Sequence, residues 1–475
     1  MMRALSLLLL LPLACRLPLP ERAEPMGDLP LVWQTPAHST NEPPSDWWRQ
    51  WGSDELASFV AEALKASPNV KVAQARVEQA RLRAELAGAE LMPQASVSLE
   101  GNRQQNNFIG LPIPGDTGGV LTSRSTSYRL SFATSWELDL WGRIRAGQLA
   151  ALADADATGA DLEGARQSLA AHTARAWVLL AESRRQTGLV EAHLKIAEAS
   201  AQQAQVRYEL GVRPALDLHL AQTHLAILRS QLEQWGVAKA SAVRQLEVLL
   251  GRYPKGAIPE PADFPRPLDA VPAGLPSGLL GRRPDIVAAR LRLLSSDARV
   301  LEARAEWYPK LSLTASTGIA SPELERLLDN DLSVWSLGAN LLQPLFAGGR
   351  LRANLKLKES MAGEAVAAYR GVVLNAFAEV ETALATEGLL AARHQKLESA
   401  VALATGTLRL AQDRHGRGLE PFLTVVDAQA RITETQSQRI AVQRQRLENR
   451  INLHLALGGG FVAANPDSVS QKARP

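Results

Sequence analysis

Two stretches of this chain have similar sequences: GVRPALDLHLAQT at residues 211–223 and GLEPFLTVVDAQA at residues 418–430. Glycine, proline, leucine, alanine and glutamine stand at identical places in both, and most positions between them are apolar. The stretches begin 207 residues apart. Self-similarity of this kind is the mark of a repeated structural unit.

The similarity continues on both sides of these stretches. RIRA at residues 143–146 corresponds to RLRA at residues 350–353 with the same offset of 207 residues. Further upstream the offset becomes 216 residues, where Pro68 corresponds to Pro284 at a predicted helix start. The sequence therefore predicts two copies of one unit, the first with nine extra residues in its middle part.

Apolar residues alternate strictly after the first helix of each unit. The alternation begins at Ala95 and Tyr128 in the first copy and at Leu311 and Val334 in the second. A period of two predicts half-buried strands, here paired as hairpins. Serine, threonine, arginine and glutamate fill the other face, as the water-filled lumen of a membrane barrel requires. The edge of a soluble β-sandwich is the alternative, although four strands among several hundred helical residues argue against it.

Long proline-free runs rich in alanine, leucine, glutamine, glutamate and arginine follow each predicted hairpin. At about 1.5 Å per residue, about 65 helical residues extend about 100 Å, so these runs predict rods that pack laterally as coiled coils. The runs are 143–213 and 215–253 in the first copy, and 345–420 and 422–464 in the second.

The two nearly identical lines are predicted to be the turns between these rods. Gly211 and Gly418 suit the left-handed residue that ends a helix. Pro214 and Pro421 suit the first turn of the next helix. Each unit is therefore predicted to contain one helical hairpin whose tip lies far from the strands.

The N-terminus has the pattern of a secretory signal. Arg3 precedes a short apolar run, and cleavage after Ala14 would expose Cys15, the only cysteine, for N-acylation. A plain secretory signal cleaved elsewhere is the alternative. The predicted segments are a signal peptide at 1–14, a proline-rich, extended, lipid-anchored segment not packed as a domain at 15–46, a first repeat at 47–252, a proline-rich linker at 253–276, a second repeat at 277–461 and a flexible tail at 462–475.

Composition and motifs argue against several classes of function. The net charge is only +3, which gives no electrostatic footprint for nucleic acid. The eight histidines form no HExxH pattern and no second cysteine exists, so no metal site is predicted. No P-loop or GxSxG motif occurs, so neither an enzyme nor a cofactor is expected.

Four strands cannot close a barrel on their own. Open strand edges are not tolerated in lipid, and the smallest single-chain barrels have eight strands. No window of about 20 apolar residues follows the signal, so a membrane crossing must use strands. The chain is therefore predicted to form an oligomer with cyclic symmetry.

Several motifs together resemble the TolC-like outer-membrane efflux protein family, in its lipoprotein branch. The resemblance covers the chain from Trp47 to Phe461. The motifs are WWRQWG from Trp47, WELDLWGRIRAG from Trp136, GLLGRRPDI from Gly278, QPLFAGGRLRA from Gln343, ALGGGF from Ala456 and the two turn lines.

The resemblance implies an α+β membrane protein with a two-fold internal repeat. Its long coiled-coil helices would form a periplasmic barrel, and its four transmembrane strands per protomer would complete a trimeric twelve-stranded β-barrel in the outer membrane. The implied function is the passive exit duct of a tripartite efflux pump. The implied partners are outer-membrane lipid, a periplasmic adaptor (membrane fusion) protein and an inner-membrane RND-type transporter. A duct for type I protein export and a non-conducting trimeric coiled-coil lipoprotein are the alternatives.

The resemblance also assigns roles at the turns. Acidic residues ring the periplasmic constriction in this family, and Asp427 stands at one such position. Thr424 stands at a position that is often acidic in the family, and Asp217 lies at the equivalent turn of the first repeat; these three residues are the candidates for a pore gate. An early-helix carboxylate stabilised by the helix dipole is the alternative for Asp217. His415 and Glu420 stand where some members carry gate-latching residues. Candidate adaptor contacts are Leu210, Gly211, Val212, Arg417, Gly418 and Leu419, for which turn chemistry alone is the alternative.

A charged motif precedes the first helix of the second repeat. Arg282, Arg283, Pro284 and Asp285 are interpreted as a helix start that is pinned to its neighbours by charged hydrogen bonds.

Overall fold

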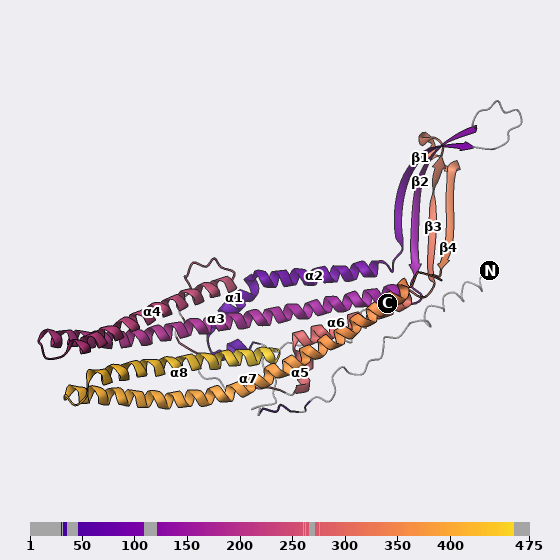
Figure 1. Ribbon diagram of the computed structural model, residues 1–475. Helices are drawn as coiled ribbons and strands as arrows, with labels where there is room; N and C mark the ends of the chain where they lie inside the picture. The colour runs from indigo at the N-terminus through magenta and orange to yellow at the C-terminus, as the bar shows by residue number, and fades with distance from the viewer. Residues whose placement is uncertain are drawn as a thin grey trace.

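The computed structural model describes residues 30, 32–35, 46–108, 121–259, 261, 263–265, 271–274 and 276–459. A long body of helices carries a four-stranded sheet at one end (Figure 1). Cys15, the predicted signal peptide and the predicted tail lie outside the described residues. The elements are η2 (Trp47–Trp51), α1 (Asp54–Ala66), α2 (Pro68–Ala89), β1 (Gln94–Phe108), β2 (Leu121–Leu138), α3 (Arg143–Glu209), α4 (Ala215–Leu249), α5 (Pro276–Arg282), α6 (Pro284–Ala305), β3 (Lys310–Ser321), η3 (Leu324–Leu328), η4 (Asn330–Leu332), β4 (Ser333–Leu342), α7 (Arg350–Gly416) and α8 (Phe422–Ala456).

The two repeats fold into helices of equal length. α2 and α6 have 22 residues each, α3 and α7 have 67, and α4 and α8 have 35. The predicted internal repeat is confirmed. α4 and α8 end earlier than predicted, because Gly251 and Gly458 adopt left-handed conformations directly after them, with φ of 72° and 86°.

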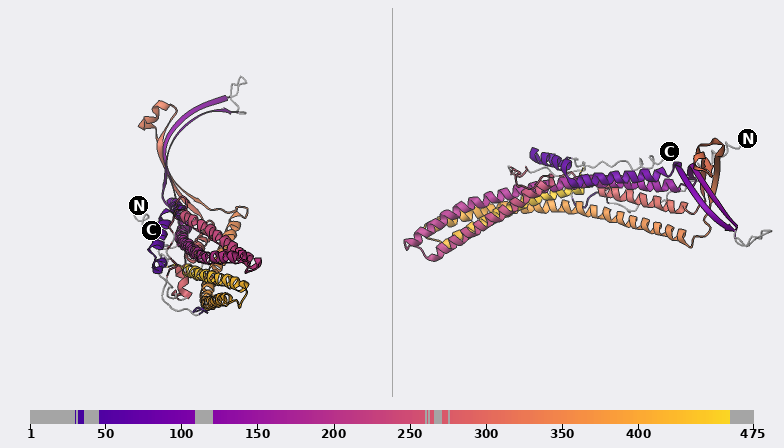
Figure 2. Two further views of the ribbon diagram at one scale, coloured as in Figure 1. Left: turned by 90° about the vertical axis from the view of Figure 1, so that its left-hand side faces the viewer. Right: turned by 90° about the horizontal axis from the view of Figure 1, so that it is seen from above.

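The long helices form one curved layer. α3 packs against α2, α4, α6 and α8, whereas α7 packs against α6 and α8. The order across the layer is therefore α2–α3–α6–α7 near the sheet and α4–α3–α8–α7 toward the far end (Figures 1 and 2). Within the described ranges, no helix combines the length and hydropathy needed to span a membrane. α7 forms one open edge of the layer, and α2 with α4 forms the other.

Small side chains bring the helices of this layer together. Ala157 and Ala160 of α3 form a buried cluster with Val287, Ala288 and Leu291 of α6. Alanine lets two backbones approach closely while the larger residues fill the remaining space. The alanine-rich composition therefore serves side-by-side packing of long rods.

The four strands pair antiparallel in the order β1–β2–β3–β4, with β1 and β4 at the edges. The four strands predicted from alternation are confirmed, and β2 begins at Leu121, before the predicted start at Tyr128. Leu99, Leu130 and Ile319 stand opposite one another across three strands. Trp335 and Leu337 of β4 are 80% and 78% exposed in the protomer. One face of the sheet is therefore an apolar surface open to its surroundings.

The opposite face of the sheet is polar. Ser98 and Ser131 lie in register, and their hydroxyl oxygens are 2.9 Å apart. Ser316 and Ser336 repeat this arrangement between β3 and β4, at 2.8 Å. The alternation read from the sequence thus becomes two chemically distinct faces, one suited to lipid and one to water.

β3 crosses β2 unusually closely at Gly318. A β-carbon on this residue would lie 2.2 Å from the carbonyl oxygen of Leu130 and 2.8 Å from Cα of Ser131. Gly318 is the register partner of Ser131, so the blocked space belongs to the paired backbone itself. Only glycine allows the two hairpins to join at this point.

The largest apolar core lies midway along the body, where η2 and α1 pack against α3 and α8. Trp47 and Trp51 are 1% and 2% exposed there. The His454 ring of α8 stacks on Trp47, with 5.0 Å between ring centroids and 10° between ring planes. This core joins the start of the first repeat to the end of the second.

Residues 32–35 of the predicted proline-rich segment lie against the helical body. The Trp33 indole N–H donates to the carbonyl oxygen of Gly274 at 3.1 Å, and its ring lies 5.8 Å from that of Phe377. The backbone N–H groups of Gln34 and Thr35 donate to the two carboxylate oxygens of Glu381, at 2.7 Å and 3.0 Å. Proline content predicts an extended backbone, but it does not reveal where one indole can dock.

Acid is expected to destabilise the protein through His454. Burial, and secondarily the charge of Arg450, lowers its pKa to about 3. The folded state therefore keeps this ring neutral while the unfolded state protonates near pH 6.5. The contribution of His454 to the free energy of unfolding should be fully present above pH 6.5. It should decrease as the pH falls toward 3, by up to about 1.4 kcal/mol per pH unit. His454→Phe keeps a ring on Trp47 without titrating, so its thermal unfolding in detergent should depend less on pH. Identical pH profiles for both proteins would contradict this assignment.

Candidate functional site

The turns between the long helices have the same backbone geometry in both repeats. Gly211 and Gly418 adopt left-handed conformations with φ of 71° and 75°, as predicted. The N–H of Val212 donates to the carbonyl oxygen of Arg207, and the N–H of Leu419 donates to that of Arg414, each at 2.9 Å. Each turn is thus a Schellman motif that satisfies the last carbonyls of its helix.

Pro214 and Pro421 directly precede the next helix, whereas they were predicted to lie within its first turn. Pro214 and Pro421 are N-cap residues in extended conformations, and α4 and α8 begin at the next residue. The fixed φ of proline holds the chain where it re-enters a helix. The glycine that ends one helix and the proline that precedes the next therefore make each tip a rigid turn.

Apolar side chains are exposed at both turns. Leu210, Val212 and Leu419 are 72%, 67% and 64% exposed in the protomer. Arg417 is also exposed and pairs with Asp413 at 3.1 Å. A helix tip that presents leucine and valine to solvent offers a small apolar contact surface to a partner.

The second turn carries a further set of contacts around His415 and Glu420. Arg414 pairs with Glu420 at 3.2 Å. Nδ1 of His415 lies 2.9 Å from the carbonyl oxygen of Glu420, and its ring lies 5.4 Å from that of Phe422. His415 and Glu420 thus brace their own turn.

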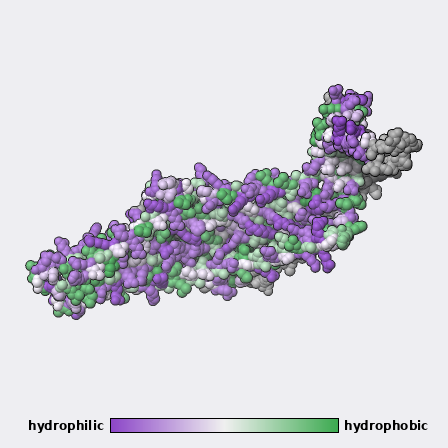
Figure 3. All heavy atoms as spheres, turned by 45° about the horizontal axis from the view of Figure 1, so that its top comes forward, coloured by the Kyte–Doolittle hydropathy of each residue, from purple (hydrophilic) through white to green (hydrophobic). Residues whose placement is uncertain are grey.

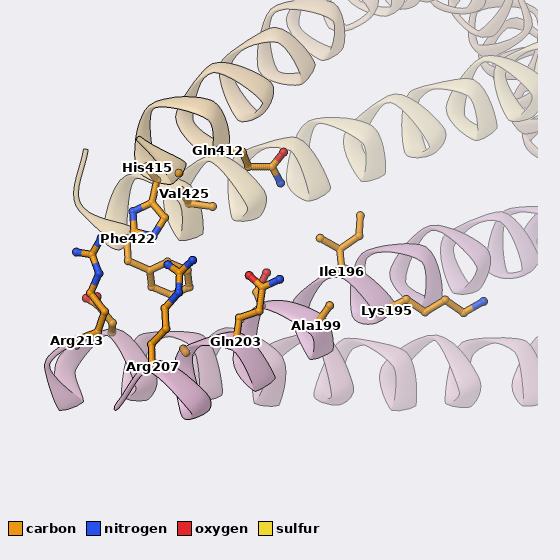
Figure 4. Close-up of a pocket in the computed structure, with 14 residues that line it drawn as sticks. Lys195, Ile196, Ala199, Gln203, Arg207, Arg213, Gln412, His415, Phe422 and Val425 are labelled. Atoms are coloured by element: carbon orange, nitrogen blue, oxygen red, sulfur yellow. The ribbon is translucent and has the colours of Figure 1, made fainter. Parts of the chain in front are cut away.

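A groove of about 510 Å³ separates the two tips. Gln203 and Arg207 approach it from α3 and Arg213 from the turn before α4, whereas His415 and Phe422 approach from α7 and α8 (Figure 4). Sequence reasoning identified neither Arg207 nor Phe422 as a site residue, since the groove exists only because two segments about 200 residues apart lie side by side. Its lining also includes Lys195 and Asp217.

The three gate candidates occupy different environments. Asp217 is half-buried in the wall of the groove, and Thr424 is half-buried at the equivalent position of the second repeat. Asp427 is exposed on α8, one turn further from the tip, and is not among the groove residues. The structure thus separates Asp427, which is open to solvent, from Asp217, which faces the other hairpin.

Part of the seam between the two hairpins is polar. Arg444 of α8 pairs with Glu182 of α3 at 2.7 Å, and Gln186 donates to the carbonyl oxygen of Ser437 at 3.1 Å. Burial raises the pKa of Glu182, although Arg444 opposes this shift. Within the first hairpin, by contrast, α3 and α4 share an apolar cluster: Val190, Ala197 and Leu228. The two hairpins are therefore joined here by polar contacts, in addition to the apolar core around Trp47.

The charged motif at residues 282–285 holds three elements together. Arg283 donates to both carboxylate oxygens of Asp285, at 2.9 Å and 2.7 Å, to Glu379 of α7 at 2.6 Å and to the carbonyl oxygen of Ala456 at 3.2 Å. Pro284 begins α6, and Arg282 is half-buried at the end of α5. Arg283 thus ties the start of α6 to α7 and to the end of α8.

The side-chain chemistry of the described ranges shows no cluster of three or more histidine, cysteine, aspartate or glutamate residues arranged to hold a metal ion. The space-filling view shows polar and apolar side chains intermixed along the helical body (Figure 3).

Comparison with known proteins links this architecture to outer-membrane transport. A family model described as outer membrane efflux protein matches residues 59–252 and 275–459. The pyoverdine export outer membrane protein OpmQ of Pseudomonas putida is 32% identical over 467 residues, which cover 96% of each chain. The outer membrane protein VceC of Vibrio cholerae is 27% identical with a TM-score of 0.80, covering 88% of this chain and 100% of VceC. The Neisseria gonorrhoeae MtrE outer membrane channel in its open state is 26% identical with a TM-score of 0.80, covering 93% and 98% of the two chains.

Proposed function

Because the chain belongs to the outer membrane efflux protein family, we propose that three copies assemble into one continuous duct. The chain is an outer-membrane exit duct for efflux in a Gram-negative bacterium. The trimer would close a twelve-stranded β-barrel above a twelve-helix barrel. Each open edge of the sheet continues into an open edge of the helical layer, and this continuity supports the proposal. The edge strand β1 follows α2 on one side, and the edge strand β4 leads into α7 on the other. An open strand edge in lipid requires a partner.

The proposed partners are a periplasmic adaptor protein at the tips and an inner-membrane RND-type transporter that supplies the energy. The duct itself is passive and catalyses no reaction. The exposed Leu210, Val212 and Leu419 support docking of an adaptor at both turns. The intervening groove carries Arg207 and Arg213, which suit a partner with acidic side chains.

Small molecules are the proposed cargo, because the relative OpmQ is named for the export of pyoverdine. Purified protein should have the mass of a trimer by light scattering and should give discrete conductance steps in planar bilayers. A folded monomer would refute the trimer. A trimer without conductance would instead favour a structural lipoprotein.

Cys15 is proposed to carry a lipid that helps target the protein to the outer membrane. Mass spectrometry of the mature protein should find an acylated N-terminal cysteine. Cys15→Ala should lose the acyl mass but should still form a conducting trimer, because the strands that close the barrel are unchanged. A mature N-terminus at another residue, without acyl mass, would exclude lipidation.

Asp427 is proposed to line the periplasmic mouth of the duct. Three exposed carboxylates around a threefold axis would favour cations and repel anions. Asp427→Ala should reduce cation selectivity and weaken block by multivalent cations, with the trimer intact. Single-channel recording at matched ionic strength measures both effects. Glu209→Ala, which removes an exposed carboxylate at the other turn, is the control; equal behaviour of the Asp427 variant and the wild type would place Asp427 outside the pore.

A further inference from the structure

A second cavity, of about 280 Å³, lies far from the tips, where the linker between the repeats meets α3, α7 and α8. Its wall combines arginines with an apolar side. Arg185 of α3, Arg446 and Arg450 of α8 and Asp263 of the linker supply the charges. Phe264 of the linker, with Leu447 of α8, supplies apolar surface.

Each nitrogen of the Arg185 guanidinium makes a hydrogen bond within the protein. Its Nε and Nη2 donate to the two carboxylate oxygens of Asp263, with the second bond at 2.8 Å. Its Nη1 donates to Gln443 at 2.7 Å, and its guanidinium lies 4.7 Å from the centre of the Phe264 ring. Arg185 therefore fixes the linker against the helices and has little capacity left for a ligand.

The guanidinium of Arg446 has longer and fewer hydrogen bonds than that of Arg185. Its Nη2 lies 3.4 Å from Oε1 of Glu387, the same oxygen that Arg450 approaches with two nitrogens at 3.3 Å. Asn449 also donates to the carboxylate of Glu387, at 3.3 Å. Nε of Arg446 is buried and has no hydrogen-bond partner among the described residues. Nε itself is enclosed, but the Arg446 side chain is 27% exposed and lines the cavity, so its terminal N–H groups can donate to an additional anion.

The first repeat shows that the helical fold does not need this charged cluster. Glu387 and Arg450 correspond, at the offset of 207 residues, to Leu180 and Val243. Both of these residues are buried in the apolar core. The same helical hairpin is therefore built with an apolar contact in one repeat and with a charged cavity in the other.

We infer that this cavity binds a small organic carboxylate, whose oxygens accept hydrogen bonds from Arg446 and whose apolar body lies against Phe264 and Leu447. A planar carboxylate matches the geometry of a guanidinium, and a pocket with apolar walls and few polar groups is typical of small-molecule sites. The ligand would contact the linker and α8 together, and so would hold the two repeats in one arrangement.

Benzoate is a suitable probe because it combines a carboxylate with an apolar ring. Thermal unfolding of the detergent-solubilised full-length protein should shift upward with benzoate and not with benzamide, which lacks the charge. Calorimetric titration should give a dissociation constant that Arg446→Gln weakens by at least about tenfold. Lys239→Gln, at the equivalent position of the first repeat, is the matched control and should bind benzoate as the wild type does.

Phe264→Ala provides a second variant that leaves the arginines in place. It removes the apolar wall and should also weaken benzoate binding while the protein keeps its oligomeric mass. Absence of benzoate binding to the wild type, equal stabilisation by benzamide, or unchanged affinity in both Arg446→Gln and Phe264→Ala would overturn the assignment.

Discussion

Replacing Gly318 with leucine is expected to abolish assembly of the membrane duct. The new β-carbon would lie 2.2 Å from the carbonyl oxygen of Leu130, which is backbone and cannot rotate away. Overpacking a core costs about 1–3 kcal/mol when side chains can adjust, and more is expected here because β2 itself must move. Separation of β2 from β3 would divide the sheet into two hairpins, and isolated hairpins are marginally stable at best. Light scattering and bilayer conductance should show neither trimer nor channel.

Gly338→Leu, which adds the same side chain to β4, is the matched control for this prediction. The β-carbon added there meets the hydroxyl oxygen of Thr314 at 3.0 Å, and this side chain can change its rotamer. The control should therefore assemble and conduct. Normal trimer yield from Gly318→Leu would mean that β2 and β3 are not joined in this register.

Arg283→Met is expected to lower the free energy of unfolding by about 2–4 kcal/mol. The substitution keeps a long apolar side chain but removes the donors that reach Asp285, Glu379 and the carbonyl oxygen of Ala456. Loss of one partner from a buried ion pair costs about 3–5 kcal/mol. The value expected here is lower because the carboxylates of Asp285 and Glu379 are about half exposed and regain water. Denaturant unfolding in detergent, followed by circular dichroism, measures the difference.

Arg292→Met tests whether any arginine of α6 would behave in the same way. Arg292 pairs with Asp161 of α3, and both side chains are about half exposed. An exposed pair contributes about 0–1 kcal/mol, so this variant should unfold close to the wild type. Similar losses for the two variants would show that burial of Arg283 has no special effect.

The repeat and the local periodicities made the elements of the protomer predictable. Strict alternation from Ala95 and Tyr128 identified strands, and the two glycine turns identified hairpins of long helices. These signals are local, because side-chain period and turn chemistry depend on a few neighbouring residues. Helix ends were less predictable, as at Leu249, where the glycine two residues later terminates the helix.

Contacts between distant segments were beyond the reach of the sequence. Nothing near Arg283 specifies that Glu379 is its partner, and nothing near Trp33 specifies that its indole N–H donates to Gly274. The groove at the tips depends on two hairpins that meet side by side, and neither hairpin contains it alone. The motif at residues 282–285 predicted charged hydrogen bonds, but only the folded layer supplies the partner helix.

Equal helix lengths limit how such a gene can change. α3 and α7 both have 67 residues, and α4 and α8 both have 35. An insertion of one residue in a single helix would displace its end by about 1.5 Å and rotate every later side chain by about 100°, out of its seam. Insertions and deletions that preserve the packing must therefore add or remove whole heptads in all four long helices together. The linker and the strand connections can instead vary in length by single residues.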